Sequence, residues 1–132
     1  MDQGWHRFQM RIVPHGGNCR DADIARKAWE MNEPVFAHVE SAHPGDLPGL
    51  YSFAGTDTPG IALTILKKSE DGDRVIVRGY EINGVETSAE IRIPGATHPI
   101  KVSFTPYEIK TIRVNPTDGS VTETNLLEEA DA

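Results

Sequence analysis

The feature that most limits the fold of this chain is a series of short β-type segments, separated by turn-forming residues. Apolar and polar residues alternate in them, so that Thr87, Ala89, Ile91 and Ile93 fall on one face, and this is the period of a half-buried strand. The turns recur roughly every 8–12 residues, which is typical of an antiparallel sandwich. The expected strands are residues 50–54, 61–67, 74–82, 85–93, 100–104, 107–114 and 121–124. The sequence predicts a mainly β fold, an antiparallel β-sandwich.

The turn sequences predict one strand pairing directly. Asn83-Gly84 separates residues 74–82 from residues 85–93. Asn-Gly favours a type I′ turn, because both central residues of that turn need φ > 0. We therefore expect these two segments to form a β-hairpin. Residues 70–73 (EDGD) predict another turn, after residues 61–67.

The N-terminal third predicts one more strand. Phe8, Met10 and Ile12 fall on one face of residues 5–13, with polar residues on the other. This alternation indicates a half-buried strand, and the PHGGN sequence that follows it favours a turn.

One short α-helix is expected near the N-terminus, over residues 21–32. Its apolar residues have helical spacing and form one stripe that includes Trp29. Pro34 then ends the helix. Because Trp29 lies in this stripe, we expect it to pack in the core. Trp5 lies outside any such stripe, so it suits core packing and sugar stacking equally.

Composition limits the class of protein further. The chain has 132 residues, the size of one domain, and we expect residues 1–132 to form a single domain. A formal net charge of −7 argues against nucleic acid and against an anionic membrane surface as partners. Cys19 is the only cysteine, so no disulfide forms within the chain, and a cytoplasmic location is expected.

The residues that could carry chemistry form no recognisable catalytic or metal-binding motif. No two histidines have the close spacing of a helical or hairpin metal site. His6 and His15 flank one expected strand, and hydrogen bonding is the role expected of them. Cys19 would need a partnered base to act as a nucleophile. The histidines are His6, His15, His38, His43 and His98.

Several stretches resemble the C-terminal region of family 38 glycoside hydrolases, which are α-mannosidases. Residues 2–8 (DQGWHRF) and 13–17 (VPHGG) resemble the family's "D-x-G-x-H-x-F … P-H-x-G" segment. Ala28, Asn32 and Pro34 resemble its "A-x-x-x-N-x-P" stretch.

The later strands carry the more specific part of the resemblance. Residues 61–71 and 75–81 are similar to the family's "L-x-A-L-K-x-x-E-D … I-V-R-x-Y-E" strands. Residues 104–114 (FTPYEIKTIRV) are similar to its "F-x-P-[YF]-E-I-K-T-[IL]-R" ending. The order differs in one place, because the family's "E-T-[ND]-L-L-E" segment precedes the final strand pair, whereas residues 123–128 (ETNLLE) follow it here.

The resemblance implies that the active site lies elsewhere in the parent enzyme. Family members hold their zinc ligands, aspartate nucleophile and acid/base carboxylate in an N-terminal β/α barrel, and none of those motifs occurs in this chain. We therefore expect a non-catalytic domain whose partner is the catalytic domain, and which meets a mannose-containing glycan at most weakly. No metal or other cofactor is expected in the chain itself. Asp2, Gln3 and His6 are the candidates for the rim of the sugar site.

Two other functions remain open. The chain could be an independent carbohydrate-binding module that uses Trp5 or Tyr51, which would require two or three exposed aromatic rings in one plane. It could also be a purely structural domain.

The C-terminal end carries one further expectation. Residues 121–127 should be ordered and should bury Val121, Leu126 and Leu127 against the sheet, with fraying beyond them.

Overall fold

The computed structural model describes residues 3–93, 96 and 98–129 of the chain. The chain divides into two compact units, Met1–Val35 and Phe36–Ala132. The expectation that residues 1–132 form one domain stays a prediction.

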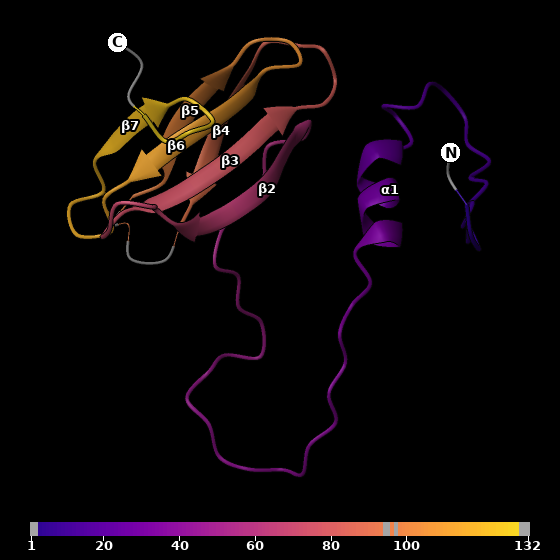
Figure 1. The fold of residues 1–132 in the computed structure, drawn as a ribbon, viewed down its shortest axis with the longest axis horizontal. Helices are drawn as coiled ribbons and strands as arrows, with labels where there is room; N and C mark the ends of the chain where they lie inside the picture. The colour runs from indigo at the N-terminus through magenta and orange to yellow at the C-terminus, as the bar shows by residue number, and fades with distance from the viewer. Residues whose placement is uncertain (1–2, 94–95, 97, 130–132) are drawn as a thin grey trace. The chain divides into compact units, whose positions relative to one another are not determined.

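The second unit is an antiparallel β-sandwich, which confirms the expected fold class. One sheet has the strand order β1-β4-β5 and the other has the order β2-β3-β6-β7. Figure 1 shows the two sheets as separate layers. The strands are β1 (Gly55–Thr56), β2 (Ile61–Lys68), β3 (Val75–Glu81), β4 (Thr87–Arg92), β5 (Ile100–Phe104), β6 (Ile109–Val114) and β7 (Val121–Thr124).

Apolar side chains from both sheets form one core between the layers. In β5 every second residue is buried, and β4 has the same alternation with Ala89 and Ile91 inside. The facing sheet contributes Val77 from β3 and Ile112 from β6 to the same cluster. The period-2 pattern of the sequence therefore marks the inner faces correctly.

The expected hairpin at Asn83-Gly84 is wrong. β3 pairs with β2 and β6, whereas β4 pairs with β1 and β5, so the chain passes from one sheet to the other at this turn. Gly84 has φ 69°, but Asn83 is not among the residues with positive φ, so the type I′ turn does not form. The backbone N–H groups of the turn bond instead to the carboxylate of Glu81.

The first unit contains the helix α1 (Ile24–Asn32). It begins three residues later than expected because Asp23 has a left-handed backbone conformation, with φ 52°. The side chain of Asn18 accepts hydrogen bonds from the N–H groups of Arg20 and Asp21, which holds a turn before the helix. Trp29 is 43% exposed, so the expectation that it packs in a core is wrong.

The expected strands at residues 5–13 and 50–54 are absent from the described structure. Phe8, Met10 and Ile12 are all more than 80% exposed. Alternation predicts a strand only where a neighbouring strand supplies hydrogen bonds and an apolar surface covers one face. No described strand pairs with either segment. Instead of a strand at residues 50–54, the structure has the shorter strand β1 directly after them, at Gly55–Thr56.

The C-terminal segment is ordered, as expected, but it buries different side chains. β7 pairs with β6 in the register Thr111↔Thr124. Leu126 and Leu127 are 63% and 76% exposed and Val121 is 40% exposed, so their expected burial is wrong. Thr124 and Glu128 are buried instead. Glu128 accepts the N–H of Glu70 at 2.9 Å, so the contacts of the segment with the sheet extend past Leu127.

Candidate functional site

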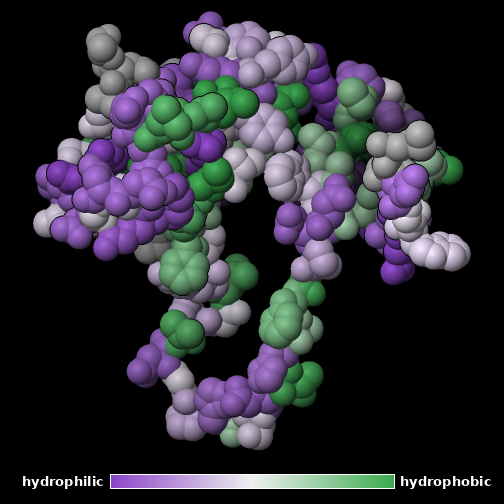
Figure 2. Space-filling model, in the orientation of Figure 1, coloured by the Kyte–Doolittle hydropathy of each residue, from purple (hydrophilic) through white to green (hydrophobic). Residues whose placement is uncertain are grey.

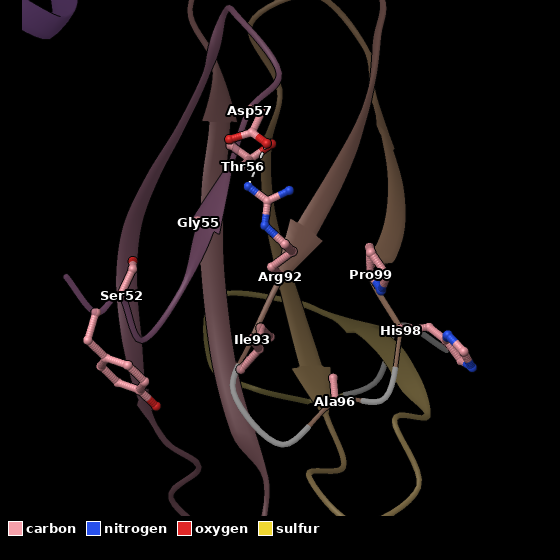
Figure 3. Close-up of a pocket in the computed structure, with 10 residues that line it drawn as sticks. Ser52, Gly55, Thr56, Asp57, Arg92, Ile93, Ala96, His98 and Pro99 are labelled. Carbon is pink, nitrogen blue, oxygen red and sulfur yellow. Dashed lines mark ion pairs between the residues drawn. The ribbon is translucent and has the colours of Figure 1, made fainter. Parts of the chain in front are cut away.

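A hollow beside β1 and β4 is the candidate binding site of the sandwich. Its volume is about 610 Å³, within the range of roughly 300–1,000 Å³ usual for ligand sites. Its walls come from residues 51–57, which lead into and include β1, and from residues on either side of the loop between β4 and β5. Figure 3 shows Arg92 and Asp57 near one end of this hollow.

An ion pair between Arg92 and Asp57 supplies the charged groups of the hollow. The guanidinium Nη2 lies 2.6 Å from the Asp57 Oδ2. The β1–β4 ladder positions this pair, because Gly55 lies opposite Arg92 and Asp57 follows the last residue of β1. Both side chains are more than half exposed, so the pair contributes little to stability and its outer donors and acceptors face solvent.

Tyr51 and Ile93 give the hollow apolar surface. Tyr51 is 52% exposed, and Ile93 is part of the core at 8% exposed. The ring of Tyr51 meets that of Phe53 edge to face, with centroids 5.2 Å apart and an interplanar angle of 89°. A flat sugar-binding platform would require the two aromatic rings to share a plane, and these two rings do not. Figure 3 shows the ring of His98 directed away from the Arg92–Asp57 pair.

Glu81 is the most deeply buried carboxylate that the structure describes, and the sequence reasoning did not single it out. It is 1% exposed. Its oxygens accept backbone hydrogen bonds from Asn83, Gly84, Val85 and Tyr107 at 2.6–3.2 Å. Burial raises the pKa of this carboxyl, but the backbone donors, Tyr107 first, outweigh burial and hold the pKa below its ordinary value. A general acid needs the opposite shift, so Glu81 serves the fold.

The rim candidates lie in the first unit. Gln3 and His6 are exposed, and the His6 ring stacks on Phe8 with centroids 6.3 Å apart. Asp2 lies outside the described residues. Trp5 is fully exposed. The assignment of Asp2, Gln3 and His6 to a sugar-site rim stays a prediction.

The described residues offer neither a metal-binding cluster nor a membrane-spanning helix. Within residues 3–93, 96 and 98–129, no three His, Cys, Asp or Glu side chains gather in a way that could hold a metal ion. Cys19 is exposed. None of the helices in that part of the chain could cross a membrane.

The fold and the hollow define the second unit as an antiparallel β-sandwich domain. Comparison with known proteins shows which family this sandwich is similar to. Residues 60–99 match the family model described as the C-terminal beta sandwich domain of glycosyl hydrolases family 38. The central part of this sandwich is thus similar to the C-terminal β-domains of family 38, as the resemblance implied.

Curated relatives agree with this family. The chain is 29% identical over 93 residues to alpha-mannosidase G of Dictyostelium discoideum, which covers 66% of this chain and 8% of that protein. It is 27% identical over 86 residues to alpha-mannosidase 2C1 of Homo sapiens, with 63% of this chain and 8% of that protein covered. The chain thus spans about 8% of the length of these relatives. No solved structure is significantly similar to it.

The segments that carry the family resemblance are joined in the fold by hydrogen bonds and an ion pair. Glu81, which ends the "I-V-R-x-Y-E" strand, accepts the N–H of Tyr107 from the "F-x-P-[YF]-E" segment. Glu128, which ends the ETNLLE segment, accepts the N–H of Glu70 at 2.9 Å and pairs with Lys67 at 2.6 Å. These residues therefore hold the sandwich together, and the sequence alone did not show that role.

Proposed function

We propose that this chain is the non-catalytic C-terminal domain of an α-mannosidase-like glycoside hydrolase, and that it packs on the catalytic barrel of that enzyme. The observation that carries the proposal is the match of the sandwich to a small part of two much longer α-mannosidases. In this arrangement the catalytic part holds the zinc and the reacting carboxylates.

Exposed apolar side chains support a covering partner. Phe36, Val39, Leu47 and Leu50 are each at least 85% exposed. Figure 2 shows hydrophobic groups along the extended segment that precedes β1. Several large apolar side chains exposed along one segment are unusual on a free surface, so this segment is the expected contact with the barrel.

The proposal is tested by co-expression of this chain with an upstream polypeptide, produced separately, that spans the catalytic part of the proposed parent enzyme. We expect one complex in size-exclusion chromatography, and we expect it to cleave 4-nitrophenyl α-mannoside faster than the upstream polypeptide alone. Leu50→Asp should weaken the complex, whereas Glu90→Lys, on the exposed side of β4, should not. Two proteins that elute apart, or an upstream polypeptide without α-mannosidase activity, would contradict the proposal.

Two finer points belong to the same proposal. Asp2, Gln3 and His6 contribute to the rim of the mannose site in the assembled enzyme, and that enzyme is cytoplasmic. The location is supported by Cys19, which is exposed and free, because a reducing compartment keeps such thiols unpaired.

Carbohydrate binding by the sandwich itself is the second candidate function. The edge-to-face packing of Tyr51 and Phe53 disfavours a flat platform. One observation favours binding of another kind, because Tyr51 lines the hollow that also contains the Arg92–Asp57 pair. A purely structural domain would need no such hollow.

A further inference from the structure

We infer that the hollow beside β1 and β4 binds one neutral sugar unit, and that the Arg92–Asp57 pair recognises two adjacent hydroxyls of its ring. The inference rests on the second candidate function and names the ligand and the residues. It is independent of how the domain packs on the catalytic barrel.

The chemistry of the pair suits a vicinal diol. A guanidinium offers only donors and a carboxylate offers only acceptors, whereas each sugar hydroxyl both donates and accepts. With Nη2 and Oδ2 2.6 Å apart, the remaining N–H groups of Arg92 and the lone pairs of Asp57 lie side by side. Two neighbouring hydroxyls can therefore bond to both groups at once.

The charge of the hollow selects a neutral ligand. An anionic ligand would meet the carboxylate of Asp57, and a cationic ligand would meet the guanidinium of Arg92. The chain as a whole carries a formal net charge of −7, which further disfavours an anion. A neutral polyol avoids both repulsions and leaves the ion pair intact.

The apolar wall suits a sugar ring in particular. One face of a pyranose presents C–H groups, and these pack on aromatic side chains. Tyr51 is half exposed at the hollow, so its ring can be covered by a ligand, and Ile93 lies at the edge of the core. Polar groups at one end and apolar surface at the other form the usual lining of a small-molecule site.

A titration of the full 132-residue chain with methyl α-mannopyranoside, followed by ¹⁵N–¹H NMR, tests the inference. We expect saturable shifts in the amides of Gly55, Thr56 and Arg92. Binding should be weaker than about 1 mM, because a small ligand in an open site gains little beyond the cost of association. Glucuronate and glucosamine, which carry a carboxylate and an ammonium, should shift these amides less.

Two variants locate the site. Arg92→Ala should lower the affinity about tenfold or more, because it removes a charged hydrogen-bond donor. Lys101→Ala is the matched control, since it breaks another exposed ion pair of the same sheet, with Glu90 at 3.7 Å, that does not line the hollow. If Arg92→Ala proves unfolded in its own NMR spectrum, Asp57→Asn keeps the shape of the side chain and should lower the affinity as well.

Three outcomes would overturn the inference. Saturable shifts of amides away from the hollow would place the sugar site elsewhere on the sandwich. Carbohydrate binding by the sandwich would then stand, but the assignment of the site to the hollow would be wrong. Unchanged affinity in a folded Arg92→Ala protein would remove the role of the pair. No saturable shift with any of the three sugars would end both the inference and the second candidate function, whereas the packing proposal would stand on its own test.

Discussion

Glu81 links two turns of the sandwich through a single buried carboxylate. It accepts hydrogen bonds from the backbone N–H groups of the crossover at residues 83–85 and of Tyr107. Tyr107 itself has a φ of 61°, which is uncommon for a residue with a side chain. A Cβ at Gly84 would collide with the Tyr107 ring. Glycine at this position therefore serves the close approach of that ring as well as the positive φ.

Removal of this carboxylate should destabilise the sandwich. Glu81→Ala leaves buried backbone N–H groups without acceptors, and we expect it to lower the free energy of unfolding by about 2–4 kcal/mol. Glu81→Gln keeps one acceptor oxygen and should cost less. The free energy of unfolding is measured by urea unfolding. The control is Glu90→Ala, on the exposed side of β4, and its free energy of unfolding should lie within about 0.5 kcal/mol of wild type. Equal stability of Glu81→Ala and Glu90→Ala would show that the carboxylate has no such role.

At the scale of elements, residues 125–129 act as a C-terminal latch across the outer face of the four-stranded sheet. The carbonyl of Leu126 accepts a hydrogen bond from Arg78 of β3 at 3.2 Å. Glu128 then reaches Lys67 of β2 and the N–H of Glu70. The latch thus joins β7 to the far edge of its sheet through polar contacts, while its two leucines stay exposed.

The latch should make stability depend on pH. The hydrogen bond from Lys67, and next that from the Glu70 N–H, hold the pKa of Glu128 below its ordinary value. A carboxyl with a lowered folded pKa stabilises the fold above its unfolded pKa, and this stability is lost as pH falls through the folded pKa. The pKa of Lys67 is raised, first by its bond to Glu128. Its contribution is therefore complete below its unfolded pKa and is lost as pH rises through the folded pKa.

Melting temperatures of wild type and Glu128→Gln test this behaviour. Wild type should melt higher at neutral pH, and the difference should shrink as the solution is acidified below about pH 4.5. Glu129→Gln is the matched control, because Glu129 lies in the same segment and its side chain accepts a hydrogen bond from the neighbouring Asn125 amide, at 3.3 Å, rather than from the sheet. A difference that stays constant with pH would rule out titration of Glu128 as the cause.

At the scale of the whole molecule, the chain consists of a β-sandwich and a smaller unit with one helix, and neither contains an assembled catalytic set among the described residues. We therefore expect the purified 132-residue protein not to hydrolyse 4-nitrophenyl α-mannoside, with or without added zinc. Release of nitrophenol is followed spectrophotometrically, with a complete α-mannosidase as the positive control. Zinc-dependent turnover by this chain alone would refute the non-catalytic assignment.

The strands from residue 61 onward could be predicted from sequence because period-2 alternation and turn residues are local signals. Of the candidate site, the sequence offered only Tyr51 as a possible sugar contact. Arg92 and Asp57 are ordinary surface residues until β1 pairs with β4, and nothing in their sequence context marks them.

What the sequence by itself determined is where the strands from residue 61 onward lie and which side of β4 and β5 is apolar. Only the tertiary structure decided which strands pair. Asn83-Gly84 can turn the chain back in a hairpin or carry it to the opposite sheet. The buried carboxylate of Glu81 accepts hydrogen bonds from the turn and stabilises the crossover to the opposite sheet. The same holds at both ends of the chain. Residues 5–13 alternate without a strand partner, and the C-terminal segment is held by Glu128 rather than by its leucines, because hydrogen-bond partners distant in sequence decide what a local pattern becomes.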